Sequence, residues 1–549
     1  MCRQHTDTSA PASVCHCEQP TAAGHQRDDD QTTIHTPLIP KSTEAPRPLL
    51  ALAGRSGSEE GELGGFVGEV RAILRIAMPM VLTGLLLYSR SMVSMLFLGR
   101  LGDLALAGGA LAIGFANITG YSILSGLAMG MEPICGQAFG ANRKALLGLA
   151  LQRTVLLLLC VSFPIALLWL GMRRILVLCG QDPAISTVAN DYILASLPDL
   201  ALQSLLHPLR VYLRTQSITM PLTYCAAASL LLHVPINYLL VSVLGLGVRG
   251  VALAGVWTNL NLVLSLVIYV HVSGVYSRTG GWQLLTAGEA FKGWGTLLSL
   301  AVPSCVSVCL EWWWYELMIL LCGLLPEPRA AVASMGVLIQ TTALVYVFPS
   351  SLGFGVSTRV GNELGANRPG RARTSAAVAV FLSATMGLAA MGFAAGMRDT
   401  WGRMFTDDAE ILRLTSAALP IVGLCELGNC PQTVGCGVLR GSARPADAAN
   451  VNLGAFYLVG MPVAVALGFA LGVGFCGLWM GLLAAQVCCA GLMLYAVGST
   501  DWDAQARRAQ ALTCPAPARA DLDGETGPPA EPHCREPFLS ITVVSRDQK

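Results

Sequence analysis

The stretch MEPICGQAFGANR, residues 131–143, returns in part as VGNELGANR at residues 360–368. Each copy follows a long apolar run. Equivalent residues of the two copies, such as Gly136 and Gly361, are 225 positions apart (361 − 136). A phrase that recurs at a fixed spacing indicates an internal repeat.

The composition shows what kind of chain carries this repeat. Of its 549 residues, 53% are hydrophobic and 13% are charged, whereas soluble domains have roughly a quarter of charged residues. A helix needs about 20 mostly apolar residues to cross a membrane. Runs of about this length lie near residues 72–98, 104–130, 145–170, 186–206, 219–243, 250–272, 294–325, 331–356, 374–396, 411–438, 448–471 and 475–498. We therefore predict an all-α integral membrane protein with about twelve transmembrane helices.

Further matches between the two halves support the repeat. They are Pro79 with Pro303, Arg214 with Arg440, and the glycine-rich strings that begin at Gly245 and Gly472. The chain therefore divides into two homologous halves of six helices. Because an even number of crossings returns the chain to the side where it began, both halves have the same orientation, as in parallel-repeat transporters.

These boundaries predict five segments. Residues 68–272 form a first lobe, residues 273–292 a linker and residues 293–498 a second lobe. Residues 1–67 are rich in Pro, Ser, Thr, Gly and charge, so we expect a disordered tail. Residues 499–549 form a second solvated tail. No apolar segment follows Met1, so we expect the first membrane helix to serve for targeting.

Basic residues are concentrated after the even-numbered helices. They are Arg143, Lys144, Arg210, Arg214, Arg278, Lys292, Arg368, Arg371, Arg373, Arg440 and Arg444. The positive-inside rule assigns these loops and both termini to the cytosol. Arg398 and Arg403, on the opposite side, partly offset this bias. The net charge of +1 gives no sign of a nucleic-acid partner, and we expect none.

No metal or nucleotide cofactor is expected. Most cysteines lie in or beside apolar spans, where they act as small hydrophobic residues, and Cys15, His16 and Cys17 are too close together for a familiar zinc site. The chain has no GxxxxGK[ST] loop, and its glycine-rich strings lie between membrane helices rather than in a βαβ unit. We therefore expect an ion gradient, not ATP, to supply energy.

Four motifs together resemble the multidrug and toxic compound extrusion (MATE) family, in its plant DETOXIFICATION branch. They are CGQAFGA with Cys135, Gly136 and Gln137, STRVGNELGAN with Arg359, Asn362 and Glu363, LEWWWYE at 310–316, and QTVGCGVLRGSARP at 432–445. The resemblance covers roughly residues 68–500. It implies a V-shaped pair of six-helix lobes that export organic solutes in exchange for protons.

Four ionisable residues lie deep in the apolar spans: Glu311, Glu426, Asp199 and Arg90. Each costs about 2.5 to 3.5 kcal/mol to insert, so it needs a function or a partner. Burial penalises the charged form of a carboxyl group, which makes Glu311, Glu426 and Asp199 candidates for proton coupling. The resemblance also implies a glutamate at Glu311 and an acidic residue near Glu426. The alternative for each is a structural carboxyl group bonded to neighbouring helices.

Other residues are candidates for the substrate cavity. Tyr315 lies one turn from Glu311 on the same helix face, and the adjacent Trp312 and the motif residue Gln432 complete the set. Ser94 stands where many bacterial and archaeal relatives have an aspartate, so the first-lobe cation site of those relatives lacks this ligand here. Asp199 could partly replace it, or it could have a structural role. Arg90 either forms an ion pair with Asp199 or meets an anionic substrate.

We therefore expect a proton-coupled antiporter that exports small organic solutes, such as xenobiotics, secondary metabolites or hormone-like compounds. A flippase-like protein or a channel with structural carboxylates is the alternative. An enzyme is disfavoured because no HExxH, His-rich box or Ser/His pair lies in the spans. The expected partners are the lipid bilayer, a small organic substrate and protons. We expect a monomer in the plasma membrane or in a vacuolar or endosomal membrane.

The repeat generates a topological prediction. Asn142→Cys and Asn367→Cys should both react with an impermeant thiol reagent from the cytosolic side, because the two halves have the same orientation. Labelling of the two positions from opposite sides would contradict a parallel repeat.

Overall fold

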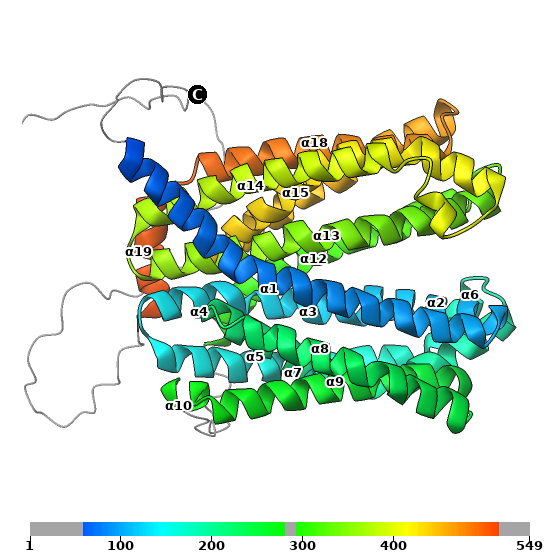
Figure 1. Cartoon of the computed structure of the whole chain (residues 1–549), viewed down its shortest axis with the longest axis horizontal. Helices are drawn as coiled ribbons and strands as arrows, with labels where there is room; N and C mark the ends of the chain where they lie inside the picture. The colour runs from blue at the N-terminus through cyan, green and yellow to red at the C-terminus, as the bar shows by residue number, and fades with distance from the viewer. Residues whose placement is uncertain (1–58, 280–292, 515–549) are drawn as a thin grey trace, which may run out of the picture. The chain divides into compact units, whose positions relative to one another are not determined.

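Helices account for almost all of the chain that the computed structural model describes, residues 59–279 and 293–514 (Figure 1). These residues lie in one compact unit that begins at Glu59. Most of the predicted N-terminal tail, most of the predicted linker and the end of the C-terminal tail lie outside the described residues.

The first lobe contains six long helical segments. They are α1 (Glu59–Arg100); α2 (Asp103–Ala116), a π-helical turn (Asn117–Tyr121), α3 (Ser122–Met129) and α4 (Met131–Gly140) in series; α5 (Lys144–Leu170); α7 (Pro183–Thr215); α8 (Met220–Asn237) with a π-helical end (Tyr238–Val243); and α9 (Gly247–Val272). Short helices α6 (Met172–Leu178) and α10 (Val275–Arg278) lie beside them.

The second lobe repeats this order. Its segments are α12 (Trp294–Cys322); α13 (Pro328–Gly365); α14 (Pro369–Gly396); α15 (Ala409–Gly441) after a 3₁₀ turn (Gly402–Met404); α16 (Pro445–Asn452), a π-helix (Leu453–Gly460), α17 (Met461–Val465) and a second π-helix (Ala466–Ala470) in series; and α18 (Phe475–Gly498). Helix α19 (Trp502–Thr513) follows.

The prediction of an all-α membrane protein is confirmed. Eleven of the described helical segments are long and apolar enough to cross a membrane. The remaining long helix, α7, has 33 residues but is more polar. It packs against α2, α5 and α9, so neighbouring helices surround much of it.

Several helices extend beyond their predicted ends. Helix α4 reaches Gly140 and α13 reaches Gly365, where the apolar runs suggested ends near residues 130 and 356. Arg210, Arg214 and Arg440, which we assigned to cytosolic loops, lie inside α7 and α15. The apolar pattern stops early because these helix ends carry polar residues that face the protein interior.

The segment after residue 499 also differs from the prediction of a solvated tail, because it contains α19. Ala506 and Ala509 of this helix are buried. The Nε2 of Gln510 donates to the carbonyl oxygen of Gly365 at 2.9 Å. Since α19 packs against α4 of the first lobe and against α13 and α14 of the second, it connects the ends of both lobes.

The backbone confirms the repeat. Asn142 and Asn367 have φ values of 56° and 55°, and Ser217 and Ala443 have values of 60° and 59°. The following amide closes each helix end, as Arg143 N does with Ala138 O at 2.8 Å. This left-handed cap satisfies carbonyl groups at a helix C-terminus, and it occurs at equivalent positions in the two lobes.

The two copies of the repeated phrase lie against each other where α4 meets α13. A Cβ atom at Gly140 would collide with the carbonyl oxygen of Asn362, and one at Gly365 would collide with that of Gln137. The Nε2 of Gln137 donates to the carbonyl oxygen of Gly441 at 3.1 Å. We call the close approach of α4 and α13 at Gly140 and Gly365 the α4–α13 crossing. It explains why the glycines occur in both halves.

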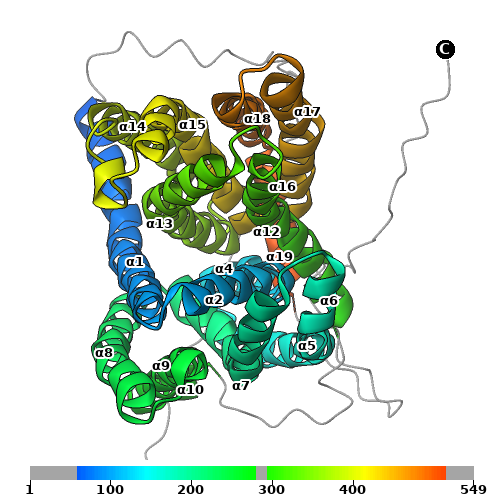
Figure 2. The same cartoon turned by 90° about the vertical axis from the view of Figure 1, so that its right-hand side faces the viewer.

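The first helix of each lobe also packs against the other lobe. Helix α1 packs against α13, and α12 packs against α3. Figure 2 shows α1 beside both groups of helices. The guanidinium group of Arg359 on α13 donates two hydrogen bonds of 2.9 Å to Glu69 on α1. The beginning of α1, which sequence order assigns to the first lobe, is therefore bonded to the second.

The α4–α13 crossing generates a prediction about stability. Gly365→Ala should lower the thermal unfolding midpoint of the purified protein, because the added methyl group meets backbone that cannot turn aside. Overpacking of this kind costs about 1 to 3 kcal/mol. Gly336→Ala on the same helix is the matched control, since a Cβ atom there meets no atom within 4 Å. Equal midpoints for the two variants would contradict the proposed contact.

Candidate functional site

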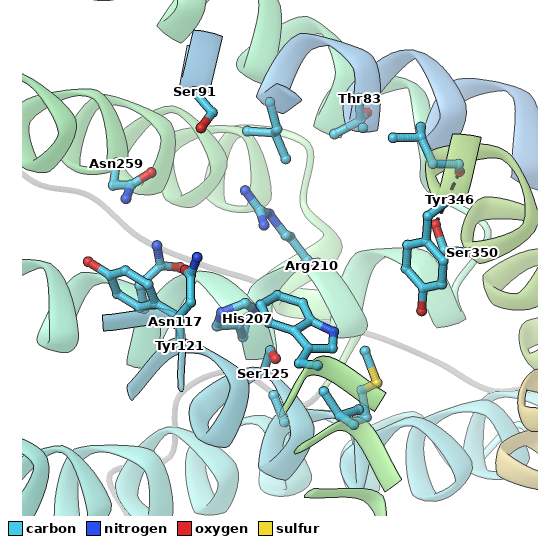
Figure 3. Close-up of a pocket in the computed structure, with 18 of the residues that line it drawn as sticks. Thr83, Ser91, Asn117, Tyr121, Ser125, His207, Arg210, Asn259, Tyr346 and Ser350 are labelled. Atoms are coloured by element: carbon cyan, nitrogen blue, oxygen red, sulfur yellow. Dashed lines mark hydrogen bonds between the residues drawn. The ribbon is translucent and has the colours of Figure 1, made fainter. Parts of the chain in front are cut away.

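A cavity of about 490 Å³ lies between the two lobes. Residues of α1, α7 and α9 line it from the first lobe, and residues of α12, α13 and α15 line it from the second. Figure 3 shows part of this lining. The volume falls within the range of about 300 to 1,000 Å³ that is usual for small-molecule sites.

Helix α7 presents a polar stripe to the cavity. Its members are Asp199, Gln203, His207, Arg210 and Arg214, all of which line the cavity. They follow one another at intervals of three or four residues, which places them on one face of a helix. Of these five residues only Asp199 was predicted as a site residue, although the helical spacing of the other four is visible in the sequence.

Asn259 on α9 separates Arg90 from Asp199. A guanidinium nitrogen of Arg90 donates to Asn259 Oδ1, and Asn259 Nδ2 donates to Asp199 Oδ1 at 2.7 Å. Gln203 Nε2 donates to the other Asp199 oxygen at 3.2 Å. Within the described residues no direct ion pair joins Arg90 to Asp199. Of the two alternatives for Arg90, the ion pair is therefore replaced by a bridge through an amide that both donates and accepts.

Ser94, which stands in place of the aspartate of many relatives, contacts a buried histidine. Its Oγ lies 3.1 Å from His233 Nε2. Thr258 Oγ1 lies 2.7 Å from His233 Nδ1, and Asn237 Nδ2 lies 3.0 Å from Nε2. Hydroxyl and amide groups thus satisfy this histidine.

The predicted carboxyl groups of the second lobe, Glu311 and Glu426, lie near enough for their charges to interact. Glu311 lines the cavity, near the side chains of Gln432 and Tyr346, which can hydrogen-bond its carboxyl group. Glu426 is buried, and its Oε2 accepts from Asn429 Nδ2 at 2.8 Å.

Polar side chains of α15 lie between these two surroundings. The Thr433 hydroxyl lies 3.4 Å from both Asn429 Oδ1 and Gln432 Oε1 and can donate to either one of them. A chain of polar side chains therefore leads from the surroundings of Glu426 to those of Glu311.

The aromatic candidates point in different directions. Trp312 lines the cavity, whereas Trp313 donates to Ile118 O at 3.3 Å. Trp314 is buried, with its ring 5.6 Å from that of Phe456. Tyr315 packs against the core of the second lobe, and Gln432 is fully buried. Tyr315 and Gln432 thus lie behind the cavity lining, where we had expected them to form part of it.

Glu132 joins the lobes beneath the cavity, and sequence reasoning missed it. Its Oε2 lies 3.1 Å from Arg214 Nη2 and 3.6 Å from Arg440 Nε. The Arg214 guanidinium carbon lies 3.9 Å from the centre of the Phe354 ring. None of the charged contacts is aligned as a hydrogen bond, so the attraction is mainly electrostatic. Glu132 lies in the quoted stretch, and its two partners are repeat equivalents.

The six motif residues lie outside the cavity lining. Cys135, Gly136 and Gln137 belong to α4, and Arg359, Asn362 and Glu363 belong to α13. Arg359 Nη2 lies 2.8 Å from Glu363 Oε1 in addition to its bonds with Glu69. Gly136, Gln137 and Asn362 lie at the α4–α13 crossing, and Arg359 joins α13 to α1. No cluster of three or more potential metal ligands occurs among the described side chains.

The family model MatE matches residues 79–239 and 303–466. The two matched segments begin at Pro79 and Pro303 and fall one in each half of the repeat. The chain belongs to the MATE family. This MATE chain is therefore a transporter and not an enzyme, and the resemblance drawn from its motifs is confirmed.

Two curated relatives are similar to this chain over most of its length. Protein DETOXIFICATION 48 of Arabidopsis thaliana is 65% identical over 82% of this chain and 84% of the relative. Protein DETOXIFICATION 49 of the same organism is 62% identical over 84% of this chain and 92% of the relative.

Solved structures show the same two-lobe fold. The crystal structure of the eukaryotic MATE transporter AtDTX14 superposes with a TM-score of 0.78 at 32% identity, over 81% of this chain and 99% of that one. The Vibrio cholerae MATE transporter VcmN in its bent form gives a TM-score of 0.69 at 18% identity, over 82% and 99% of the chains. The second match concerns the fold alone.

The Asn259 bridge generates a prediction. Asn259→Ala should destabilise the protein, because it removes the bonded partner of Arg90 and a donor to Asp199. Arg90→Ala should cause a similar loss, and the double variant should lose little more than either single variant. Thermal unfolding of the four proteins gives the coupling energy. Additive losses would show that the bridge does not unite the two charges.

Proposed function

We propose that this chain is a proton-coupled antiporter that exports small organic solutes by alternating access between its two lobes. The observation that carries the proposal is Glu311, a carboxyl group in the lining of the interlobe cavity and connected through α15 side chains to the buried Glu426. A solute in the cavity can therefore lie beside the carboxyl group that takes up and releases the proton.

Arg440 offers a route from protonation to lobe movement. It lies near enough to Glu311 to interact with its charge, and it also pairs with Glu132 of the first lobe. A change of charge on Glu311 thus acts on a residue that holds the lobes together. Alternating access would require this ion pair and the α4–α13 crossing to separate.

We further propose that the α4–α13 crossing and both termini face the cytosol. Arg143, Lys144, Arg368, Arg371 and Arg373 all lie at or just beyond the ends of α4 and α13, as the positive-inside rule expects for a cytosolic surface. The described state would then be closed toward the cytosol. We propose a monomer in the plasma membrane or an endomembrane, and the DETOXIFICATION name of the relatives fits a foreign or toxic solute.

The coupling role of Glu311 can be tested in proteoliposomes with an imposed pH gradient. Glu311→Gln should abolish gradient-driven transport while expression and folding are retained, because the amide keeps the shape of the side chain but cannot release a proton. The readout is uptake of a panel of organic solutes with and without the gradient.

Glu316→Gln on the same helix is the matched control and should leave the gradient dependence intact. If Glu311→Gln behaves like the wild type, the coupling site lies elsewhere, with Glu426 and Asp199 as the next candidates. Transport by the wild type that ignores the gradient would favour a flippase-like protein or a channel.

A further inference from the structure

We propose that Arg210 binds a carboxylate group of the transported solute, so that the cavity selects small organic acids. The proposal rests on the transport function proposed above and specifies its substrate class. Sequence reasoning had considered Arg90 for this role, but Arg90 is occupied by Asn259.

Arg210 differs from the other arginines that line the cavity. Arg90 is bonded to Asn259, and Arg214 and Arg440 share Glu132. Among the described residues, Arg210 has no hydrogen-bond or ion-pair partner. Figure 3 shows its side chain, with that of His207 one turn away, reaching into the cavity.

A guanidinium group in this position remains charged, and although the charge of Asp199 acts on it, no described carboxylate is bonded to it. Arginine does not lose its proton in proteins, and an unpaired charge away from bulk water is costly. The carboxyl groups nearby have other partners, because Asp199 accepts from Asn259 and Gln203, and Glu132 is shared by Arg214 and Arg440. A carboxylate on the solute can supply the missing bonded partner, and it matches the planar fork of donors.

The repeat shows that the scaffold does not require an arginine here. Arg214 and Arg440 are repeat equivalents, 226 positions apart (440 − 214), and both are arginine. At the same spacing, Arg210 corresponds to Cys436, which also lines the cavity. The pair that holds the lobes together is thus kept in both halves, whereas the charge at Arg210 is specific to one side of the cavity.

The remaining lining fits the body of such a solute. Trp312 and Tyr121 line the cavity together with Ser125 and Asn117, which offers aromatic surface beside small polar groups. A carboxylate attached to an aromatic or apolar body would therefore contact both kinds of group. This is the usual composition of a small-molecule site.

The test compares three probes that share a ring system but differ in charge: 1-naphthoate, 1-naphthamide and 1-naphthylmethylammonium. Their binding is measured by equilibrium dialysis on the full chain in nanodiscs of phosphatidylcholine, without a pH gradient. Arg210→Gln should weaken naphthoate binding about ten- to hundredfold, the loss expected for a charge-assisted hydrogen bond, and leave the other two probes within about twofold.

Two further variants make the result specific. Arg210→Lys should retain part of the naphthoate affinity, because it keeps the charge but loses the fork. Arg373→Gln removes a positive charge from an exposed site outside the cavity and should change nothing. Unchanged naphthoate binding by Arg210→Gln, or an equal loss for all three probes, would overturn the proposal.

The binding assay does not depend on proton coupling. If naphthoate binds through Arg210 but proteoliposomes show no response to a pH gradient, the carboxylate site stands and the antiport function fails. If transport is gradient-driven but Arg210 has no effect on naphthoate, only the substrate class is wrong.

Discussion

A buried carboxylate links the two halves of this transporter. Glu132 of the first lobe faces Arg214 of its own lobe and Arg440 of the other, and it is almost fully buried. Breaking a buried ion pair by removing one partner typically costs about 3 to 5 kcal/mol. The lobes can therefore separate here only if water or another charge replaces the lost partner. Together with the tight α4–α13 crossing, this favours two discrete arrangements over gradual opening.

The two lobes share a backbone plan but differ in the chemistry of their central helices. Both α7 and α15 turn polar side chains toward the middle of the molecule. In α7 the stripe is basic near its end, with His207, Arg210 and Arg214, whereas α15 carries the neutral Thr433 and Cys436 before Arg440. The acidic group on the side of the second lobe comes from α12, through Glu311. The two lobes keep the same arrangement of helices, and differences at individual positions give the cavity two unlike sides.

Much of this architecture could be predicted from the sequence because membrane helices and repeats leave regular patterns. The spacing of Gly136 and Gly361 located the two halves, and the cost of burying charge pointed to Glu311, Glu426 and Asp199. The pattern could not show that α7 and α15 continue through Arg214 and Arg440, because hydropathy treats an inward-facing arginine like one in a loop. It also could not reveal Asn259, since an amide in a helix gives no sign of the two charges that it connects. Contacts between segments far apart in the sequence determine where these side chains lie and what they bind.

Helix α19 has a consequence for how the protein is made. It follows the twelve long helical segments in the chain, yet it contacts the end of α4, whose residues leave the ribosome far earlier. The glycine-rich surfaces of α4 and α13 are both synthesised before α19. They can therefore pair without it, and α19 can then pack against a junction that the two lobes form by themselves.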